Sequence, residues 1–230
     1  MINNRNHEVI EKLDSFFIQY KQQIYKKGEI LIRADDNPLG IFFLKSGIIK
    51  KYVISKKGDE LVVNLFKPDS FFPMSWAIND TPNIYYYEAR TDAEVWRAPK
   101  DAVLTFIQEN PDILYDLLQR VYMGTAGILL RMTYLMSGSA YSRLITEILI
   151  HAKRFGEECL PSDLLDVSKS HKNAVIIHIS ENDLAMQSGM TRETISRELK
   201  ILKEKRLVTF IKNSLVVLDT EALEFELSGD

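Results

Sequence analysis

The stretch from Ile179 to Lys205 constrains the fold most, because it carries the signals for two short helices joined by a tight corner. Ser180 is a good N-cap, with Asp183 three residues on. Gly189 supplies the left-handed residue that ends a helix, and Thr191 is placed to cap the next one. Two caps and one glycine within so short a span predict a helix-turn-helix.

The second of these helices is predicted to have two unlike faces. At about 100° per residue, Ile195, Leu199 and Leu202 fall on one side, at spacings that pack inward. Arginine can pair with guanine O6 and N7, glutamate can accept from cytosine N4, and lysine suits phosphate. The other face carries these residue types, and we expect it to bind DNA rather than only water: Arg192, Glu193, Ser196, Arg197, Lys200 and Lys203.

Charge supports this interpretation locally but not globally. The chain of 230 residues has a formal net charge of -3, which gives no overall sign of nucleic-acid affinity. Residues 191–212, however, hold seven Lys or Arg against three Glu. Local basicity is what contact with phosphate needs.

The run from Gly189 to Arg197, GMTRETISR, resembles the recognition helix of the CRP/FNR family of bacterial transcription regulators. The family pattern is Gly, a short residue, Thr or Ser, Arg, Glu, Thr, Val or Ile, Ser or Gly, Arg. The resemblance implies that Arg192, Glu193 and Arg197 read bases. Ser196 is expected to assist, and Lys200, Lys203 and Lys212 to hold the DNA backbone.

Residues 1–22 are expected to be helical, because apolar residues recur at helical spacing. From Ile24 to Arg97 the pattern changes to short strands broken by glycine, with a hairpin turn at 56–59. Strands at this spacing predict an antiparallel barrel or jelly roll. The main β-rich runs are 29–32, 41–44, 48–54, 61–66 and 85–89. Residues 20–100 also resemble the β-roll sensor of the same family, with residues 25–31 as its opening strand.

The cyclic-nucleotide site of that family is where this sequence departs. Members that bind cyclic AMP carry Gly-Glu followed by Arg and Ser or Thr, and here Pro73-Met74 and Asn83-Ile84 stand at those positions. A cyclic phosphate needs a cation and backbone amides, and a ribose hydroxyl favours a carboxylate. Pro73 removes an amide, Met74 the carboxylate and Ile84 the hydroxyl. We therefore expect that cyclic AMP is not the ligand.

The same stretch is aromatic and apolar, and two interpretations stay open. Its side chains either line a pocket for an apolar or aromatic small molecule or fill the barrel without a ligand. The candidate effector residues are Phe71, Phe72, Met74, Trp76, Tyr85 and Tyr87.

No catalytic residue, metal site or cofactor is expected. The single cysteine, Cys159, excludes an intramolecular disulfide and a multi-cysteine iron–sulfur site. Residues 24–97 contain no His, which argues against haem or a cupin-like metal centre in the barrel. The four histidines are expected to be surface or structural residues. No signal peptide or transmembrane run is seen, so the cytoplasm is the expected compartment.

A long helix is expected to begin at Asn110 and Pro111. Its apolar residues alternate spacings of four and three, which is the heptad seam of a coiled coil. A parallel homodimer is therefore expected, with two recognition helices about 34 Å apart on a near-palindromic DNA site. The seam residues are Leu114, Leu118, Val121, Thr125, Ile128, Met132 and Leu135. Leu117, Leu129 and Leu130 lie off the seam and are expected to cover the β-roll.

The rest of the chain completes an α+β fold. Residues 137–139 are expected to form a hinge and 140–155 a helix. A polar loop at 156–173 and a strand at 175–179 follow. Strands at 207–212 and 215–219 predict a wing, with Lys212 at its tip. Residues 221–230 are an acidic tail with no assigned role.

The sequence thus predicts three parts: a cyclic-nucleotide-binding-like β-roll (jelly roll) at 1–109, a dimerisation helix at 110–137 and a winged helix-turn-helix at 138–230. The expected function is that of a non-enzymatic, DNA-binding transcription regulator, with RNA polymerase as a further partner and an unidentified small-molecule effector. Two alternatives stay open. One is the same regulator without an effector, controlled by its abundance, and the other is a ligand-binding module that contacts protein.

Overall fold

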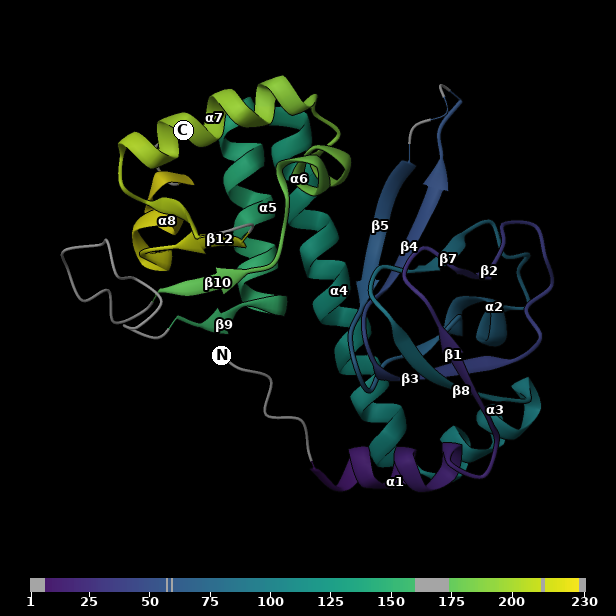
Figure 1. Ribbon diagram of the computed structural model, residues 1–230. Coiled ribbons are helices and arrows are strands. Elements are labelled where there is room, and N and C mark those ends of the chain that lie inside the picture. Colours follow the sequence, from purple (N-terminus) through teal and green to yellow (C-terminus); the bar gives the residue numbers. More distant parts are fainter. Residues whose placement is uncertain (1–6, 57, 59, 160–173, 212–213, 228–230) are drawn as a thin grey trace. The chain divides into compact units, whose positions relative to one another are not determined.

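A computed structural model of the chain describes residues 7–56, 58, 60–159, 174–211 and 214–227 (Figure 1). The chain forms two compact units. Residues 3–121 make up the first, which we call the β-roll unit. Residues 122–230 make up most of the second, which we call the helical unit. Each is described by itself.

Two four-stranded antiparallel sheets build the β-roll unit. In spatial order the first sheet consists of β1 (Lys21–Tyr25), β8 (Ala93–Ala98), β3 (Ile41–Ser46) and β6 (Phe71–Phe72). The second consists of β2 (Ile30–Ile32), β7 (Tyr86–Ala89), β4 (Ile49–Ile54) and β5 (Glu60–Phe66). This confirms the antiparallel roll predicted from the sequence.

The β-roll unit has two hydrophobic clusters, one on each side of the first sheet. The inner cluster takes residues from both sheets, including Phe42, Ile49 and Tyr87, so it lies between them. The outer cluster packs that sheet against α1 (His7–Phe17) and α3 (Lys100–Glu109). Both faces of β3 are therefore buried, which explains its continuous apolar run Ile41–Leu44.

Several local expectations for this unit were wrong. The N-terminal helix ends at Phe17 rather than near residue 22, because Lys21–Tyr25 pair with β8 as a strand. The predicted opening strand at 25–31 is instead the end of β1, a turn and the start of β2. Strands β6 and β8, and helices α2 (Met74–Asn79) and α3, were not predicted. The hairpin between β4 and β5 is confirmed by their antiparallel pairing, although residues 57 and 59 of its turn lie outside the described residues.

Gly47 shows why one of the predicted strand breaks needs glycine. Its φ is +89°, and a Cβ at this position would lie 2.3 Å from the carbonyl oxygen of Asp92. Both the left-handed backbone and the close approach of the next strand exclude a side chain here.

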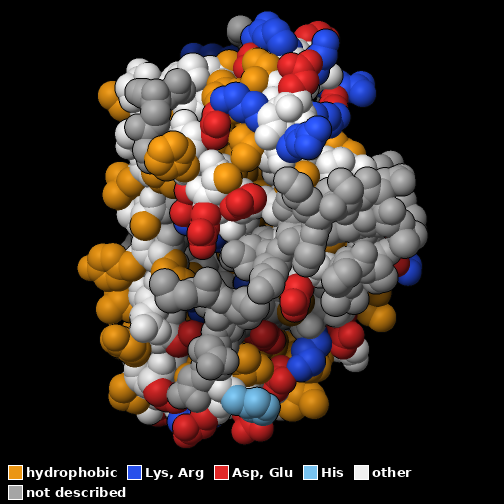
Figure 2. All heavy atoms as spheres, turned by 90° about the vertical axis from the view of Figure 1, so that its left-hand side faces the viewer, with side chains coloured by type: hydrophobic (Ala, Val, Ile, Leu, Met, Phe, Trp, Pro, Cys, Tyr) orange, Lys and Arg blue, Asp and Glu red, His pale blue; other side chains and the backbone are white. Residues whose placement is uncertain are grey.

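Helix α4 (Pro111–Ser137) begins at the proline predicted to open it and runs for 27 residues. All seven seam positions are exposed in the single chain. Of the apolar residues off the seam, Leu117 packs against the outer cluster of the β-roll unit, but Leu129 and Leu130 are exposed. Leu129 and Leu130 belong to the helical unit, so the expectation that they cover the roll stays a prediction. Figure 2 shows one face of the molecule, with exposed hydrophobic side chains along its left-hand edge.

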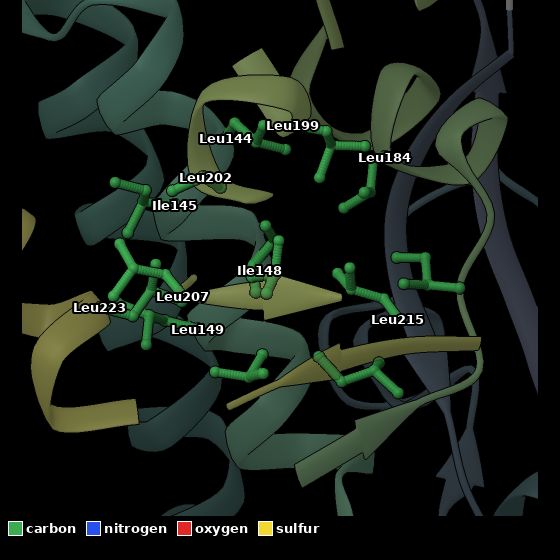
Figure 3. Packing of buried hydrophobic residues seen from close by; sticks show 14 of the residues in the cluster. Leu144, Ile145, Ile148, Leu149, Leu184, Leu199, Leu202, Leu207, Leu215 and Leu223 are labelled. Carbon is green, nitrogen blue, oxygen red and sulfur yellow. The ribbon is translucent and has the colours of Figure 1, made fainter. Parts of the chain in front are cut away.

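The helical unit packs its helices and a small sheet around one core (Figure 3). The helices are α5 (Ala140–Phe155), α6 (Glu181–Ser188), α7 (Arg192–Glu204) and α8 (Thr220–Leu227). In this core, helix α5 packs against α6 and α7. The residues that meet are Leu144, Ile145, Ile148 and Leu149 of α5, Leu184 of α6, and Leu199 and Leu202 of α7. The sheet order is β11 (Val208–Ile211), β12 (Ser214–Val217), β10 (Val175–Ile177) and β9 (Glu157–Glu158).

The end of the chain corrects one expectation in this unit. Residues 221–227 of the predicted acidic tail belong to α8, whose Leu223 is fully buried in the core, and residues 228–230 lie outside the described residues. Glu224 pairs with Lys153, and Glu226 pairs with Lys205 and accepts a hydrogen bond from the Tyr141 hydroxyl. The polar loop expected at 156–173 begins with the short strand β9, and residues 160–173 lie outside the described residues.

No helix within the described residues is long and apolar enough to cross a membrane.

Candidate DNA-binding site

The first helix of the predicted helix-turn-helix begins with a complete capping box. The Ser180 Oγ accepts from the Asp183 backbone N–H at 3.1 Å, and the Asp183 carboxylate accepts from the Ser180 N–H at 3.0 Å. These two bonds satisfy donors that a helix start otherwise leaves unpaired. Gly189 ends the helix with φ of +64°. A Cβ there would meet only the Arg143 guanidinium, at 3.9 Å, so the backbone angle rather than space favours glycine.

Helix α7 starts three residues after this turn. The Thr191 hydroxyl accepts from the Thr194 N–H at 3.2 Å and caps it, as predicted. Ile195, Leu199 and Leu202 are fully buried in the core of the helical unit. Because the inner face is fixed in this way, the opposite face is presented to solvent. All six residues predicted on it are exposed: Arg192, Glu193, Ser196, Arg197, Lys200 and Lys203.

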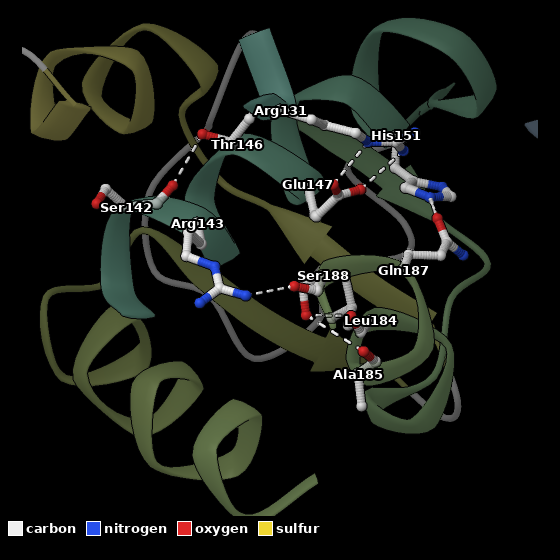
Figure 4. A network of polar contacts seen from close by, with 10 residues as sticks. All are labelled: Arg131, Ser142, Arg143, Thr146, Glu147, His151, Leu184, Ala185, Gln187 and Ser188. Atoms are coloured by element: carbon white, nitrogen blue, oxygen red, sulfur yellow. Dashed lines mark hydrogen bonds and ion pairs between the residues drawn. The ribbon is translucent and has the colours of Figure 1, made fainter. Parts of the chain in front are cut away.

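Helix α5 anchors the turn that precedes α7 (Figure 4). The Arg143 guanidinium donates to the Ser188 carbonyl oxygen at 2.7 Å, and His151 contacts the Gln187 side-chain oxygen. The Ser188 hydroxyl donates back to the Leu184 carbonyl at 2.6 Å. These contacts fix the C-terminal end of α6, and thereby the point from which α7 starts.

Two cations on the outer face of α7, Arg192 and Lys200, form only long ion pairs with carboxylates. Arg192 Nε lies 4.0 Å from Glu181, and Lys200 Nζ lies 4.0 Å from Glu204. Ion pairs at that length between exposed groups are weak, so these side chains are free to turn towards an anion.

Arg197 is held more firmly than the other cations. Its Nε and Nη2 donate to one carboxylate oxygen of Glu198 at 3.0 and 2.9 Å. The Glu198 side chain is only 9% exposed, whereas the Arg197 side chain is 67% exposed. A buried carboxylate therefore positions an exposed guanidinium.

Glu193 occupies the first turn of α7. Hydrogen bonds from its own backbone N–H and from the Thr191 hydroxyl, together with the neighbouring Arg192, hold the pKa of the Glu193 carboxyl below its ordinary value. The side chain is therefore an ionised acceptor at neutral pH, the form needed to accept from cytosine N4.

The predicted wing is present as the β11–β12 pair. The Lys203 ammonium lies 4.5 Å from the centre of the Phe210 ring, so the wing and the end of α7 touch. Lys212, predicted at the wing tip, lies outside the described residues.

The six candidate effector residues fall on both sides of the first sheet of the β-roll unit. Phe72, Tyr85 and Tyr87 belong to the inner cluster between the sheets. Phe71, Met74 and Trp76 belong to the outer cluster. The structure thus brings together three residues on each side and not all six, because neighbours along β6 point to opposite faces.

Family comparisons agree with this geometry. The profile for the cyclic nucleotide-binding domain matches residues 22–110, and the profile for the Crp-like helix-turn-helix domain matches residues 143–225. The chain belongs to the CRP/FNR family of transcription regulators. It is therefore a DNA-binding regulator of the CRP/FNR type.

Individual relatives of this CRP/FNR regulator are distant. It is 24% identical over 201 residues to the global nitrogen regulator of Nostoc sp., covering 85% of this chain and 84% of that one. The anaerobic regulatory protein of Haemophilus influenzae is 24% identical, over 97% of this chain and 82% of that one. The crystal structure of a CRP/FNR transcriptional regulator from Thermus thermophilus has a TM-score of 0.68 at 20% identity, over 91% and 99% of the two chains. At that identity the structural likeness shows the fold alone.

The sequence did not reveal two residues that support α7 in this CRP/FNR regulator, Arg143 and Glu198. Arg143 reaches the turn from α5, 45 residues away, and no local pattern marks it. Glu198 was detectable in principle, because it falls on the apolar side of α7 where a charge needs a partner.

Proposed function

We propose that this regulator binds a near-palindromic DNA site as a homodimer and reads bases with α7 of each protomer. One observation carries the proposal: α7 has a fully buried apolar face and, opposite it, an exposed face of base-reading and phosphate-binding residue types. Lys and Arg side chains gather at the top of Figure 2, among acidic ones. A helix of this kind, inserted into the major groove of DNA, contacts base edges with its N-terminal residues.

Within this site the proposed roles follow position along α7. Arg192, Glu193 and Arg197, with help from Ser196, meet base edges, because they lie in the N-terminal two turns. Lys200 and Lys203 hold phosphates, because they lie further along the helix. Lys212, which lies outside the described residues, is proposed to do the same, as expected from the sequence. Glu198 keeps the Arg197 guanidinium oriented before DNA arrives, which lowers the entropy cost of binding.

Dimerisation is proposed through the α4 seam. Seven consecutive a and d positions, six of them large and apolar, are exposed in the single chain. A monomer rarely leaves such a stripe in water. A second copy of α4 buries it by knobs-into-holes packing and gives the two-fold symmetry that a palindromic site needs.

The proposed mechanism is a switch between two states of the dimer, and it involves three parts of the chain: residues 1–109, 110–137 and 138–230. A signal felt by the β-roll shifts the dimer helices and the 137–139 hinge, which places both α7 helices in register with DNA or out of it. Cyclic AMP is not the proposed signal, because Pro73, Met74 and Ile84 lack the groups that a cyclic nucleotide needs. RNA polymerase is the proposed further partner, and the cytoplasm the proposed compartment.

A rival within the same class is a regulator without an effector, controlled by its own abundance. The candidate aromatic residues support a regulator without an effector, because they fill two hydrophobic clusters of the β-roll unit. A module that contacts protein instead of DNA would show no salt-dependent affinity for DNA.

Selection from a randomised DNA library, first without any added ligand, tests the proposal. Recovery of a motif with two-fold symmetry supports a dimeric reader. Lys200→Ala is expected to weaken binding to all sequences alike and to lower the salt slope by about one. Lys153→Ala is the matched control, because this exposed lysine on α5 pairs with Glu224 of α8 instead. Selection that stays flat, alone and with a panel of small molecules and cyclic nucleotides, contradicts the proposal.

A further inference from the structure

Two consecutive lysines on β4 have opposite environments. Lys50 forms ion pairs with Glu60 at 2.6 Å and with Glu88 at 3.3 Å. Lys51 points to the other face of the sheet, because side chains alternate along a strand. That face is the interior of the roll: Ile49, two residues earlier, belongs to the inner cluster, and Tyr87, the cross-strand partner of Lys51, belongs to it as well.

Two aromatic rings lie near the Lys51 ammonium. Its Nζ lies 3.7 Å from the centre of the Tyr85 ring and 5.9 Å from that of Tyr87. Behind these rings the stack continues inward, with Tyr87 and Phe72 centred 5.3 Å apart and Phe72 and Phe66 4.8 Å apart. Cation–π contact stabilises an ammonium, but it does not neutralise it.

The charge of Lys51 has no counter-charge in the part of the chain that the structure describes. No carboxylate there forms an ion pair with it. Burial lowers the pKa of Lys51 to about 8, and no neighbouring charge raises it. Lys51 is half-buried and at neutral pH still mainly protonated, so its positive charge is held partly out of water at a cost in free energy. A bound anion would remove that cost.

These observations identify a class of ligand. A flat ring fits against aromatic faces, and an ammonium without a partner selects an acid over a neutral molecule. We propose that the β-roll binds an aromatic carboxylic acid, with its carboxylate on the Lys51 ammonium and its ring against Tyr85 and Tyr87. This inference rests on the proposed role of the roll as the sensor. It adds a residue and a charge requirement that the aromatic residues alone do not supply.

Benzoate and benzamide are suitable probes, because they share a shape and differ in charge. Titration of the full-length protein, without DNA, is followed by NMR of 13C-labelled lysine side chains. The Lys51 signal is assigned by its loss in Lys51→Met. Benzoate is expected to shift this signal saturably and to raise the pKa of Lys51, whereas benzamide does neither.

Variants separate a binding role from a structural one. Lys51→Met is expected to weaken benzoate binding at least tenfold, and Lys51→Arg to retain it. Lys50→Met is the control on the opposite face of the strand, because it removes an ammonium that is already paired with Glu60 and Glu88, and it is expected to leave benzoate binding nearly unchanged. The proposal is overturned if benzoate gives no saturable shift, if benzamide binds equally well, or if Lys51→Met binds benzoate like the wild type. Because DNA is absent, each of these results leaves the DNA-binding proposal standing.

Discussion

The ion pair between Arg131 of α4 and Glu147 of α5 is expected to be a main support of the helical unit (Figure 4). Arg131 Nε and Nη2 donate to the two carboxylate oxygens of Glu147 at 2.6 and 2.8 Å. The Glu147 side chain is 4% exposed and that of Arg131 23%. Burial raises the pKa of Glu147, and Arg131 opposes that rise. Replacing Arg131 by Met leaves a buried carboxylate without its cation.

The size of the effect follows from this geometry. Two unit charges about 4 Å apart attract by about 4 kcal/mol at an effective dielectric constant of about 20. Removing one partner of a buried pair costs roughly 3–5 kcal/mol. Two features favour the lower end. Arg131 keeps some contact with water, and the nearby Arg154, whose pKa is lowered by burial and then by Arg131, is relieved of repulsion. We expect Arg131→Met to lose about 3 kcal/mol of local stability, or roughly a hundredfold in the opening equilibrium.

Amide hydrogen exchange read by mass spectrometry measures this loss locally. Protection of the α5 peptide, Ala140–Phe155, is expected to fall roughly a hundredfold in Arg131→Met. Protection of β3, Ile41–Ser46, is expected to stay unchanged and serves as the internal control. The double variant Arg131→Met with Glu147→Leu is expected to return within about 1 kcal/mol of the wild type.

The effect of pH gives a further check of the same reasoning. Without Arg131 the folded-state pKa of Glu147 rises further above its unfolded value. The deficit of Arg131→Met is therefore expected to shrink as the pH is lowered towards 5, where protonation removes the buried charge. A loss under about 1 kcal/mol at neutral pH, or a double variant no better than the single one, would refute the reasoning.

Three further predictions address the dimer, the turn and the roll. Leu118→Lys combined with Met132→Lys is expected to give monomers in analytical ultracentrifugation, whereas Leu129→Lys, off the seam, leaves the dimer intact; an unchanged dimer in the seam variant would exclude α4 as the interface. Gly189→Ala is expected to cost about 1 kcal/mol in thermal unfolding, because φ is +64° and the space is open. Burial lowers the folded-state pKa of Lys51 from 10.5 to about 8. Between these two pH values the unfolded state holds more protons than the folded state. As the pH is raised through this range, the free energy of unfolding of the wild type is therefore expected to increase relative to that of Lys51→Met, by at most about 3 kcal/mol in urea titrations. A difference between the two proteins that does not change with pH would show that Lys51 is not buried as a cation.

The helix-turn-helix was predictable because its signals are local. Ser180, Gly189 and Thr191 each act within three or four residues, and all three have the predicted cap or turn geometry. The exposed and buried faces of α7 follow from helical period alone. The start of α4 at Pro111 and the full extent of α5 were predicted for the same reason.

What could not be predicted depends on partners distant in sequence. Strand β8 is recognised only by its pairing with β1 and β3, about 70 and 50 residues away. The segment 221–230 reads as an acidic tail until α5 is seen to cover Leu223. Lys51 looks like one of two surface lysines until the register with Tyr87 places it on the inner face of its sheet.

The base preference of Arg197→Ala, profiled on the selected DNA site beside the wild type, tests the central claim most directly. If Arg197 reads a base, affinity for the preferred site falls by about 1–3 kcal/mol and discrimination is lost at one position in each half-site. An equal loss on every sequence, with the preference intact, would show that Arg197 contacts only phosphate and would contradict base reading by this side chain.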